Sequence, residues 1–213
     1  SPAGVEVPQK IVTLRIVARH KAAFQGDELV LSLRGIGLRH GKFGIFHRYD
    51  GSDESRVIFS AASLVEPGSF DIANIKEQEI PGISLFLVLP GPIDAVEAFD
   101  MMMEAARTLA QSMDAELLDE SGSTLSIQRE RYMREEVIQW SLCHIAEDSL
   151  HRGEIHDTKT VLAVERAQTL DKDGVPEVPA QHVKQHECLA VADRLGAGAV
   201  TTAKRRQREV LLF

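Results

Sequence analysis

Residues 83–89 carry apolar side chains on both faces of a predicted strand, and this pattern restricts the folds that the chain can adopt. The segment reads Ile-Ser-Leu-Phe-Leu-Val-Leu, so leucines follow one another on one face while Phe86 and Val88 occupy the other. Residues 42–48 show the same arrangement. An antiparallel sheet normally buries one face and leaves the other in water. Apolar residues on the second face therefore predict a binding surface that is buried by something outside the domain.

The composition of the chain is that of an ordinary globular protein. Its 213 residues are 44% hydrophobic and 26% charged, which suffices for one sizeable domain or two small ones. The formal net charge of -8 argues against a general affinity for nucleic acid or anionic lipid, since both require a surplus of Lys and Arg. No apolar run approaches the ~18 residues that span a bilayer. We therefore expect no membrane-inserted segment in this sequence.

The distribution of aromatic residues predicts a domain boundary near Trp140. Ten of the eleven aromatic residues lie at or before Trp140, and a segment without large aromatic anchors has little from which to build a core. We expect a linker remnant over residues 1–9, a folded domain over residues 10–140, and an extension over residues 141–213 that is largely disordered or forms short helices. Because the sequence lacks an initiator Met, we also expect it to be a piece of a longer protein.

The order of the predicted elements indicates an α+β domain with two layers. Strands are predicted at residues 11–16, 43–49, 57–64, 83–89, 115–120 and 123–127. Helices are predicted at residues 27–34, 93–113 and 128–140. Helices that follow and return to an antiparallel sheet in this order can all cover one face of the sheet.

Strand parity divides the apolar residues between two faces of this sheet, because successive side chains point to opposite sides. The face expected to pack against the helices carries Val12, Leu14, Phe46, Phe59, Leu85 and Leu87. The opposite face carries Ile11, Phe43, Ile45, Leu64 and Phe86. Burial of this second face by the chain's own tail or by a second copy is an alternative to the binding of a foreign segment.

The sequence contains no recognisable catalytic or cofactor motif, so we expect no enzyme activity and no cofactor. Residues 35–41 are glycine-rich, but they follow a predicted helix, whereas a phosphate-binding loop precedes one. His20, His40 and His47 lack Cys, Asp or Glu at the spacing of a metal site or a catalytic triad.

The tail offers a weak metal motif and a basic run. On a helix, His182 and His186 would lie close together with Cys188 nearby, but no fourth ligand is evident, so we predict no metal site. Residues 204–208 read Lys-Arg-Arg-Gln-Arg, which we interpret as a solvated charge run.

Three segments of the sequence resemble a known family. They are Phe-His-Arg at 46–48, Phe-Ser-Ala-Ala-Ser-Leu-Val-Glu-Pro-Gly-Ser-Phe-Asp at 59–71, and Pro-Gly-Ile-Ser-Leu-Phe at 81–86. Over about residues 10–140 the chain is similar to the C-terminal FtsZ-binding domain of the bacterial cell-division protein ZipA. The resemblance implies a split β-α-β fold with a six-stranded antiparallel sheet. One face would hold the helices, and the other would form a shallow apolar groove for the C-terminal tail of FtsZ.

The resemblance also implies which residues line the groove and where the protein acts. Carried over position by position, the groove residues are Ile11, Phe43, Ile45, Leu64, Glu66, Ser84 and Phe86. Glu66 departs from the family pattern, in which a lysine stands at this position. The family's N-terminal membrane helix and linker are absent here, so the resemblance implies membrane contact only through an anchor of the intact protein. That protein would be an adaptor on the cytoplasmic side of the inner membrane at the division site.

Two other function classes remain open at the level of sequence. A small-molecule-binding regulatory domain could use a similar α+β sheet, and the glycine-rich residues 35–41 are the one hint of such a pocket. An RNA-binding sheet would need exposed aromatic residues surrounded by Arg and Lys, and the acidic balance of the chain argues against it.

Overall fold

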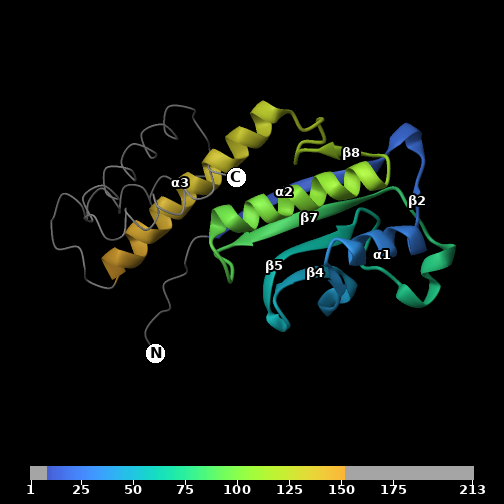
Figure 1. Cartoon of the computed structure of the whole chain (residues 1–213), viewed down its shortest axis with the longest axis horizontal. Helices are drawn as coiled ribbons and strands as arrows, with labels where there is room; N and C mark the ends of the chain where they lie inside the picture. Colours follow the sequence, from blue (N-terminus) through green and yellow to red (C-terminus); the bar gives the residue numbers. More distant parts are fainter. Residues whose placement is uncertain (1–8, 152–213) are drawn as a thin grey trace. The chain divides into compact units, whose positions relative to one another are not determined.

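The computed structural model describes residues 9–151 of the chain (Figure 1). The chain divides into two compact units, Ser1–Arg134 and Glu135–Phe213. The sheet and the helices that cover it belong to the first unit. The described residues of the second unit belong to a helix that begins in the first unit.

A six-stranded antiparallel sheet forms one layer of the first unit, as the sequence predicted. Its strands follow the order β3-β4-β5-β7-β1-β8, and every neighbouring pair is antiparallel. The strands are β1 (Lys10–Ala18), β3 (Arg39–His40), β4 (Phe46–Asp50), β5 (Asp53–Ser63), β7 (Gly82–Leu89) and β8 (Ala115–Leu118). A separate two-stranded sheet pairs β2 (Phe24–Gln25) with β6 (Glu79–Ile80).

Three α-helices lie within the described residues, namely α1 (Gly26–Gly35), α2 (Ala95–Ser112) and α3 (Ile127–His151). The short 3-10 helices are η1 (Arg19–Lys21), η2 (Lys42–Gly44) and η3 (Ile72–Glu77). Together with the sheet, these elements confirm the α+β class. Strands β2 and β6 were not predicted from the sequence, and they pair with each other. In the chain, β2 immediately precedes α1 and β6 follows η3.

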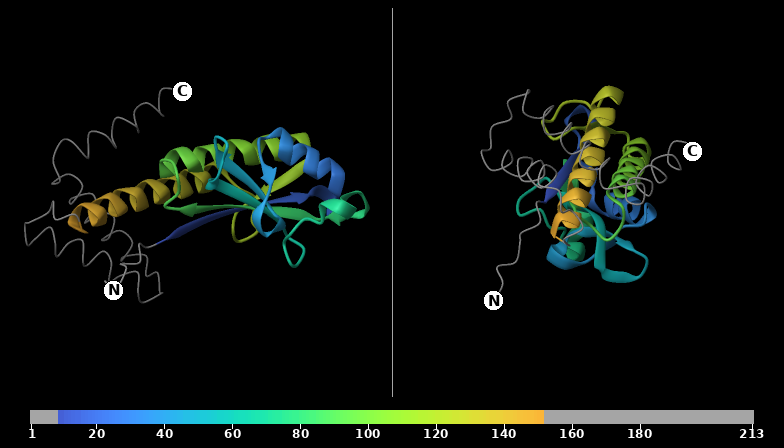
Figure 2. Two further views of the ribbon diagram at one scale, coloured as in Figure 1. Left: turned by 90° about the horizontal axis from the view of Figure 1, so that it is seen from below. Right: turned by 90° about the vertical axis from the view of Figure 1, so that its left-hand side faces the viewer.

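Helices α1 and α2 lie on the same side of the six-stranded sheet (Figure 2). Helix α2 packs on β1, β5, β7 and β8. Its first turn is capped by Asp94, whose carboxylate accepts a hydrogen bond from the backbone N–H of Glu97 at 3.2 Å. The helix presents Phe99 and Met102 among its buried residues, and the sheet contributes Leu14 and Leu85 to the same core. The covered face of the sheet therefore forms the apolar core of the domain together with α2.

Helix α3 begins beside α2 and extends beyond its predicted end. Arg134 donates two hydrogen bonds to the carboxylate of Asp100 in α2, at 2.9 and 3.0 Å, and Arg107 pairs with Glu130. The predicted helix end at Trp140 is wrong, because the helix continues to His151. The sequence carries no Gly or Pro between residues 123 and 152 that would end it. The rest of the predicted extension, residues 152–213, lies outside the described residues.

The predicted strand at residues 123–127 is wrong. This segment makes one isolated bridge, between Leu118 and Thr124, before α3 begins. The carboxylate of Asp119 instead accepts hydrogen bonds from the Ser121 hydroxyl at 2.6 Å and the Ser123 N–H at 3.0 Å, and these lower its pKa below the ordinary 3.8. The sixth strand of the sheet is instead β3, which lies in the glycine-rich stretch at residues 35–41, where no strand was predicted.

Candidate functional site

The face of the sheet opposite α1 and α2, called here the open face, is built from alternate residues of β1, β7, β5 and β4. Across these strands Thr13 pairs with Phe86, Phe86 with Ser60, and Ser60 with His47. This register sets Phe86 in a central strand of the sheet, with neighbours on both sides. Its position agrees with the parity argument, because Leu85 and Leu87 on the same strand are buried on the covered face.

Large apolar side chains are exposed to solvent on and around the open face. Phe43 is 85% exposed, Ile11 60%, Leu64 41% and Val88 37%. Phe86 is partly exposed, and Ile45 is buried. Exposed apolar groups gathered in one place are typical of an interaction surface rather than of a monomer's ordinary surface.

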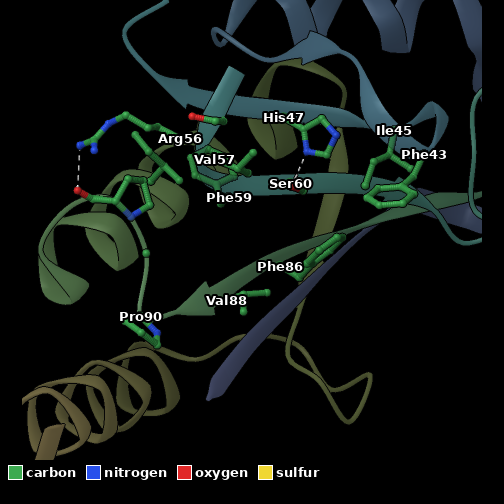
Figure 3. A pocket seen from close by; sticks show the side chains of 14 residues that line it. Phe43, Ile45, His47, Arg56, Val57, Phe59, Ser60, Phe86, Val88 and Pro90 are labelled. Atoms are coloured by element: carbon green, nitrogen blue, oxygen red, sulfur yellow. Dashed lines mark hydrogen bonds between the residues drawn. The ribbon is translucent and has the colours of Figure 1, made fainter. Parts of the chain in front are cut away.

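A hollow of about 590 Å³ opens between β4, β5 and the end of β7 (Figure 3). In Figure 3, Phe43 and Ile45 stand at one end of the hollow, while Phe86 and Val88 lie along β7. Its lining residues are Phe43, Ile45, His47, Ser55, Arg56, Val57, Ile58, Phe59, Ser60, Phe86, Val88, Pro90, Gly91 and Pro92. The hollow is therefore mostly apolar, with Ser55 and Arg56 as polar residues at one end and His47 and Ser60 as polar residues on β4 and β5.

Three of the seven predicted groove residues, Phe43, Ile45 and Phe86, line this hollow together. Ile11 and Ser84 lie outside it but belong to the open face: Ile11 pairs with Val88 across β1 and β7, and Ser84 precedes Phe86 by two positions in β7. Ile11 would extend the apolar surface along the sheet, and Ser84 would add a hydroxyl group to the open face.

The remaining two predicted residues, Leu64 and Glu66, follow the end of β5 in an exposed loop and do not line the hollow. The loop is held near the sheet by a hydrogen bond from the N–H of Leu64 to the carbonyl oxygen of Gly82, at 3.0 Å. Glu66 is exposed to solvent in this loop.

Phe43 is displayed on a turn, where the sequence predicted a strand. It occupies η2 with φ of 62°, and Gly44 follows with φ of 66°. Two consecutive residues of positive φ end the extended conformation, which explains why β4 begins only at Phe46. A Cβ at Gly44 would lie 2.9 Å from the Cβ of Ser69, so glycine is required there by close approach as well. The N–H of Phe70 fastens the turn by donating to the carbonyl oxygen of Gly44 at 2.7 Å.

His47 is a buried part of the site that sequence reasoning missed. In the sequence, His47 has no metal-site or catalytic spacing and was therefore assigned no role, yet its side chain lines the hollow and is buried. Its Nδ1 lies 2.7 Å from the hydroxyl of Ser60, and its Nε2 lies 2.9 Å from the carbonyl oxygen of Lys42. The sequence did hold a signal for His47. It lies two positions after Ile45 in a predicted strand, so both side chains should point to the open face.

The polar end of the hollow was also missed. Arg56 donates to the carboxylate of Asp50 at 2.6 Å and to the carbonyl oxygen of Pro92 at 3.0 Å, which joins β5 to the segment after β7. Nearby, hydrogen bonds from the hydroxyl and the N–H of Ser55 hold the pKa of Asp53 below its ordinary value. Pairs so exposed contribute little to stability.

No group of three or more metal-ligating side chains occurs among residues 9–151. In the same range, no helix is both long and apolar enough to cross a membrane. The weak metal motif at His182, His186 and Cys188 and the basic run at residues 204–208 lie outside the described residues.

Comparison with known proteins identifies a family for most of the described chain. The family model described as "ZipA, C-terminal FtsZ-binding domain" matches residues 10–136. A cell division protein ZipA of Xylella fastidiosa is 39% identical over 129 residues, which are 60% of this chain and 53% of that protein. The ZipA of Xanthomonas euvesicatoria is 37% identical over 138 residues, covering 64% and 57%. That of Pseudomonas fluorescens strain SBW25 is 35% identical over 133 residues, covering 62% and 46%. The chain thus spans about half the length of these relatives.

Proposed function

Since the chain belongs to the family of ZipA C-terminal FtsZ-binding domains, we propose that it is a cell-division adaptor that binds the C-terminal tail of FtsZ on its open face. The observation that supports this most strongly is the set of apolar side chains around the hollow, with Phe86 on an inner strand of the sheet and Phe43 85% exposed at one end of the hollow. Phe43, Phe86 and Val88 keep part of their apolar surface exposed to solvent in the free domain. A partner that covers them gains free energy without disturbing the core.

The proposed contact rests on apolar anchors rather than on charge. Phe43 and Phe86 offer accessible apolar surface to side chains of the tail. The third anchor, Ile45, is buried. A few large anchors that enter such a hollow carry most of the binding energy in a typical interface, while the rim mainly excludes water. We therefore place Ile11, Leu64, Glu66 and Ser84 around the central contact as supporting or rim residues.

For the whole protein we propose that this domain links the division ring to the inner membrane, on its cytoplasmic side. The proposal rests on the family alone, because the chain spans about half the length of its relatives. Its test uses the full-length protein: pelleting with phospholipid vesicles should carry FtsZ into the pellet, and deletion of the residues that precede this domain should leave FtsZ in the supernatant.

The direct test of the domain's function is a binding titration with a fluorescently labelled peptide of the FtsZ C-terminal residues, followed by anisotropy. We expect saturable binding, and we expect a peptide of the same composition in scrambled order to bind at least tenfold more weakly. Equal binding of the two peptides, or binding of neither, would refute the proposed function.

We further propose that residues 10–140 suffice for this binding. A chain that ends at Trp140 should bind the peptide as tightly as the full chain and melt within a few degrees of it. A strong gain in affinity on truncation would instead identify the later residues as a cover for the open face. Peptide titration and thermal melting of the two chains distinguish these outcomes.

A further inference from the structure

The turn that displays Phe43 has a backbone conformation that its own sequence does not favour. Residues with a Cβ and an aromatic ring rarely adopt φ near +60°, because the Cβ then crowds the backbone. Such a conformation persists only where surrounding contacts hold it in place. Phe43 is 85% exposed, so its side chain does not supply those contacts.

Three backbone hydrogen bonds hold the ends of the turn. The N–H of Gly41 donates to the carbonyl oxygen of Ile45 at 2.9 Å, the N–H of Gly44 donates to that of Gly41 at 3.2 Å, and the N–H of Phe70 donates to that of Gly44 at 2.7 Å. None of the three reaches the carbonyl oxygen of Lys42, the residue immediately before Phe43. That oxygen is met by the imidazole of His47 at 2.9 Å, and more weakly by the N–H of Ile45 at 3.4 Å.

The hydrogen bonds of His47 determine its tautomer. A carbonyl oxygen only accepts, so Nε2 carries a proton and donates to Lys42. In the neutral ring, Nδ1 is then the acceptor and takes the hydroxyl proton of Ser60 at 2.7 Å. Both nitrogens of the buried ring therefore have a hydrogen-bond partner. The ring is fixed between β5 and the turn.

The sheet register connects this contact to the centre of the open face. Ser60 lies between His47 on β4 and Phe86 on β7 in a single cross-strand row. The chain of contacts runs from the Phe43 turn through His47 and Ser60 to the strand pair that carries Phe86. One buried histidine thus joins the segments that bear the two aromatic anchors.

We propose that His47 is a positioning residue for peptide binding, which acts by holding the Lys42–Gly44 turn so that Phe43 projects at the end of the hollow. This inference rests on the proposed function of the open face. It assigns to His47 an indirect role, through Phe43, rather than a direct contact with the peptide.

The test is a double-mutant cycle on peptide affinity. His47→Phe keeps an aromatic ring of similar size and removes both hydrogen bonds. In the wild-type background we expect it to weaken binding about fivefold or more, whereas in the Phe43→Ala background we expect less than a twofold further loss, because the two residues act through one contact. Equal losses in the two backgrounds, or no loss in either, would overturn the proposal.

The matched control is His40→Phe. His40 is exposed on β3 and packs edge-on against Phe46, a contact that phenylalanine retains. We expect this variant to bind like the wild type. If it weakens binding as much as His47→Phe does, the effect of the His47 substitution is a general consequence of altering this sheet edge, and the proposal is wrong.

A peptide-free measurement separates this proposal from the function on which it rests. In amide NMR spectra of the free protein, His47→Phe should shift or broaden the signals of Phe43 and Gly44 while leaving those of β1 unchanged, and His40→Phe should not. Unchanged Phe43 and Gly44 signals would overturn the positioning role. Failure of the wild type to bind the peptide would instead refute the proposed function.

Discussion

The two faces of strand β7 differ in what their side chains do, although the residues alternate along one short segment. Leu85 and Leu87 are fully buried against the helical layer, whereas Val88 is 37% exposed and Phe86 is partly exposed on the open face. Burial of an apolar side chain stabilises the fold by about 1.5–3 kcal/mol, and an exposed one contributes little of this. The comparison shows that one strand can provide stability on one side and keep apolar surface available for a partner on the other.

The phenylalanines of the domain show the same contrast between buried and exposed side chains. Phe46, Phe59 and Phe99 are almost completely buried, whereas Phe43 projects from a turn into solvent. Because the Phe43 side chain is exposed in the free domain, it contributes little to the stability of the fold. Folding alone therefore does not explain its position. We therefore expect substitutions on the covered face to change stability and substitutions on the open face to change binding.

The largest expected effect is on the covered face. Leu85→Ala should lower the free energy of unfolding by about 2–5 kcal/mol, because truncation leaves a cavity in a well-packed core. Urea denaturation measures this loss. Peptide affinity per folded molecule should stay within about twofold of the wild type, and a tenfold loss of affinity at unchanged stability would mean that the two faces are wrongly assigned.

The next largest effect is on the open face. Phe86→Ala should weaken binding of the FtsZ peptide at least tenfold, since loss of a central aromatic anchor commonly costs about 2 kcal/mol or more of binding free energy. Calorimetric titration gives the affinity, and a thermal melt should show an intact fold. If the variant unfolds while its folded fraction binds normally, Phe86 belongs to the core.

A rim residue should matter much less. Glu66→Lys reverses the charge at this position, and because the side chain is exposed we expect a change in affinity worth about 0–1 kcal/mol. Glu66→Gln serves as the neutral control. A change of more than tenfold in either direction would make Glu66 a central contact and shift the site toward the loop after β5.

The smallest expected effect is that of salt. Apolar contacts lose little to ionic screening, so affinity should change by less than about threefold between roughly 50 and 200 mM salt, whereas a site built on phosphate contacts would lose orders of magnitude. Peptide anisotropy repeated across this range provides the measurement. A steep fall would contradict an apolar site and favour one built on Arg56 and its neighbours.

Alternation in the sequence predicted the sheet and the division of β7 and β1 between two faces, because the side-chain period of a strand is fixed by geometry. The false strand at residues 123–127 shows the limit of this reasoning. Its residues alternate as a strand would, but hydrogen bonds to the carboxylate of Asp119 select a turn instead. Competition between side-chain and backbone acceptors is not visible in a pattern of hydrophobicity.

Parts of the candidate site depend on contacts between distant residues and could not be predicted from local sequence. The Phe43 turn is held by His47 and by Phe70, which is far along the chain. The polar end of the hollow forms because Arg56 meets the carbonyl oxygen of Pro92, which lies 36 positions later. Parity could place residues on a face, but it could not show which of them line one hollow. That distinction separates Phe43, Ile45 and Phe86 from Leu64 and Glu66.

The most direct test of the central claim, that the open face binds the FtsZ tail, is an NMR measurement of intermolecular contacts. Protein with labelled Ile, Leu and Val methyl groups is mixed with unlabelled FtsZ C-terminal peptide, and intermolecular nuclear Overhauser effects are recorded. We expect contacts from Ile11, Ile45 and Val88, and none from Leu31, which is 67% exposed on α1. Contacts from Leu31 or from other methyl groups of the helical layer, with none from Ile45 and Val88, would contradict the claim.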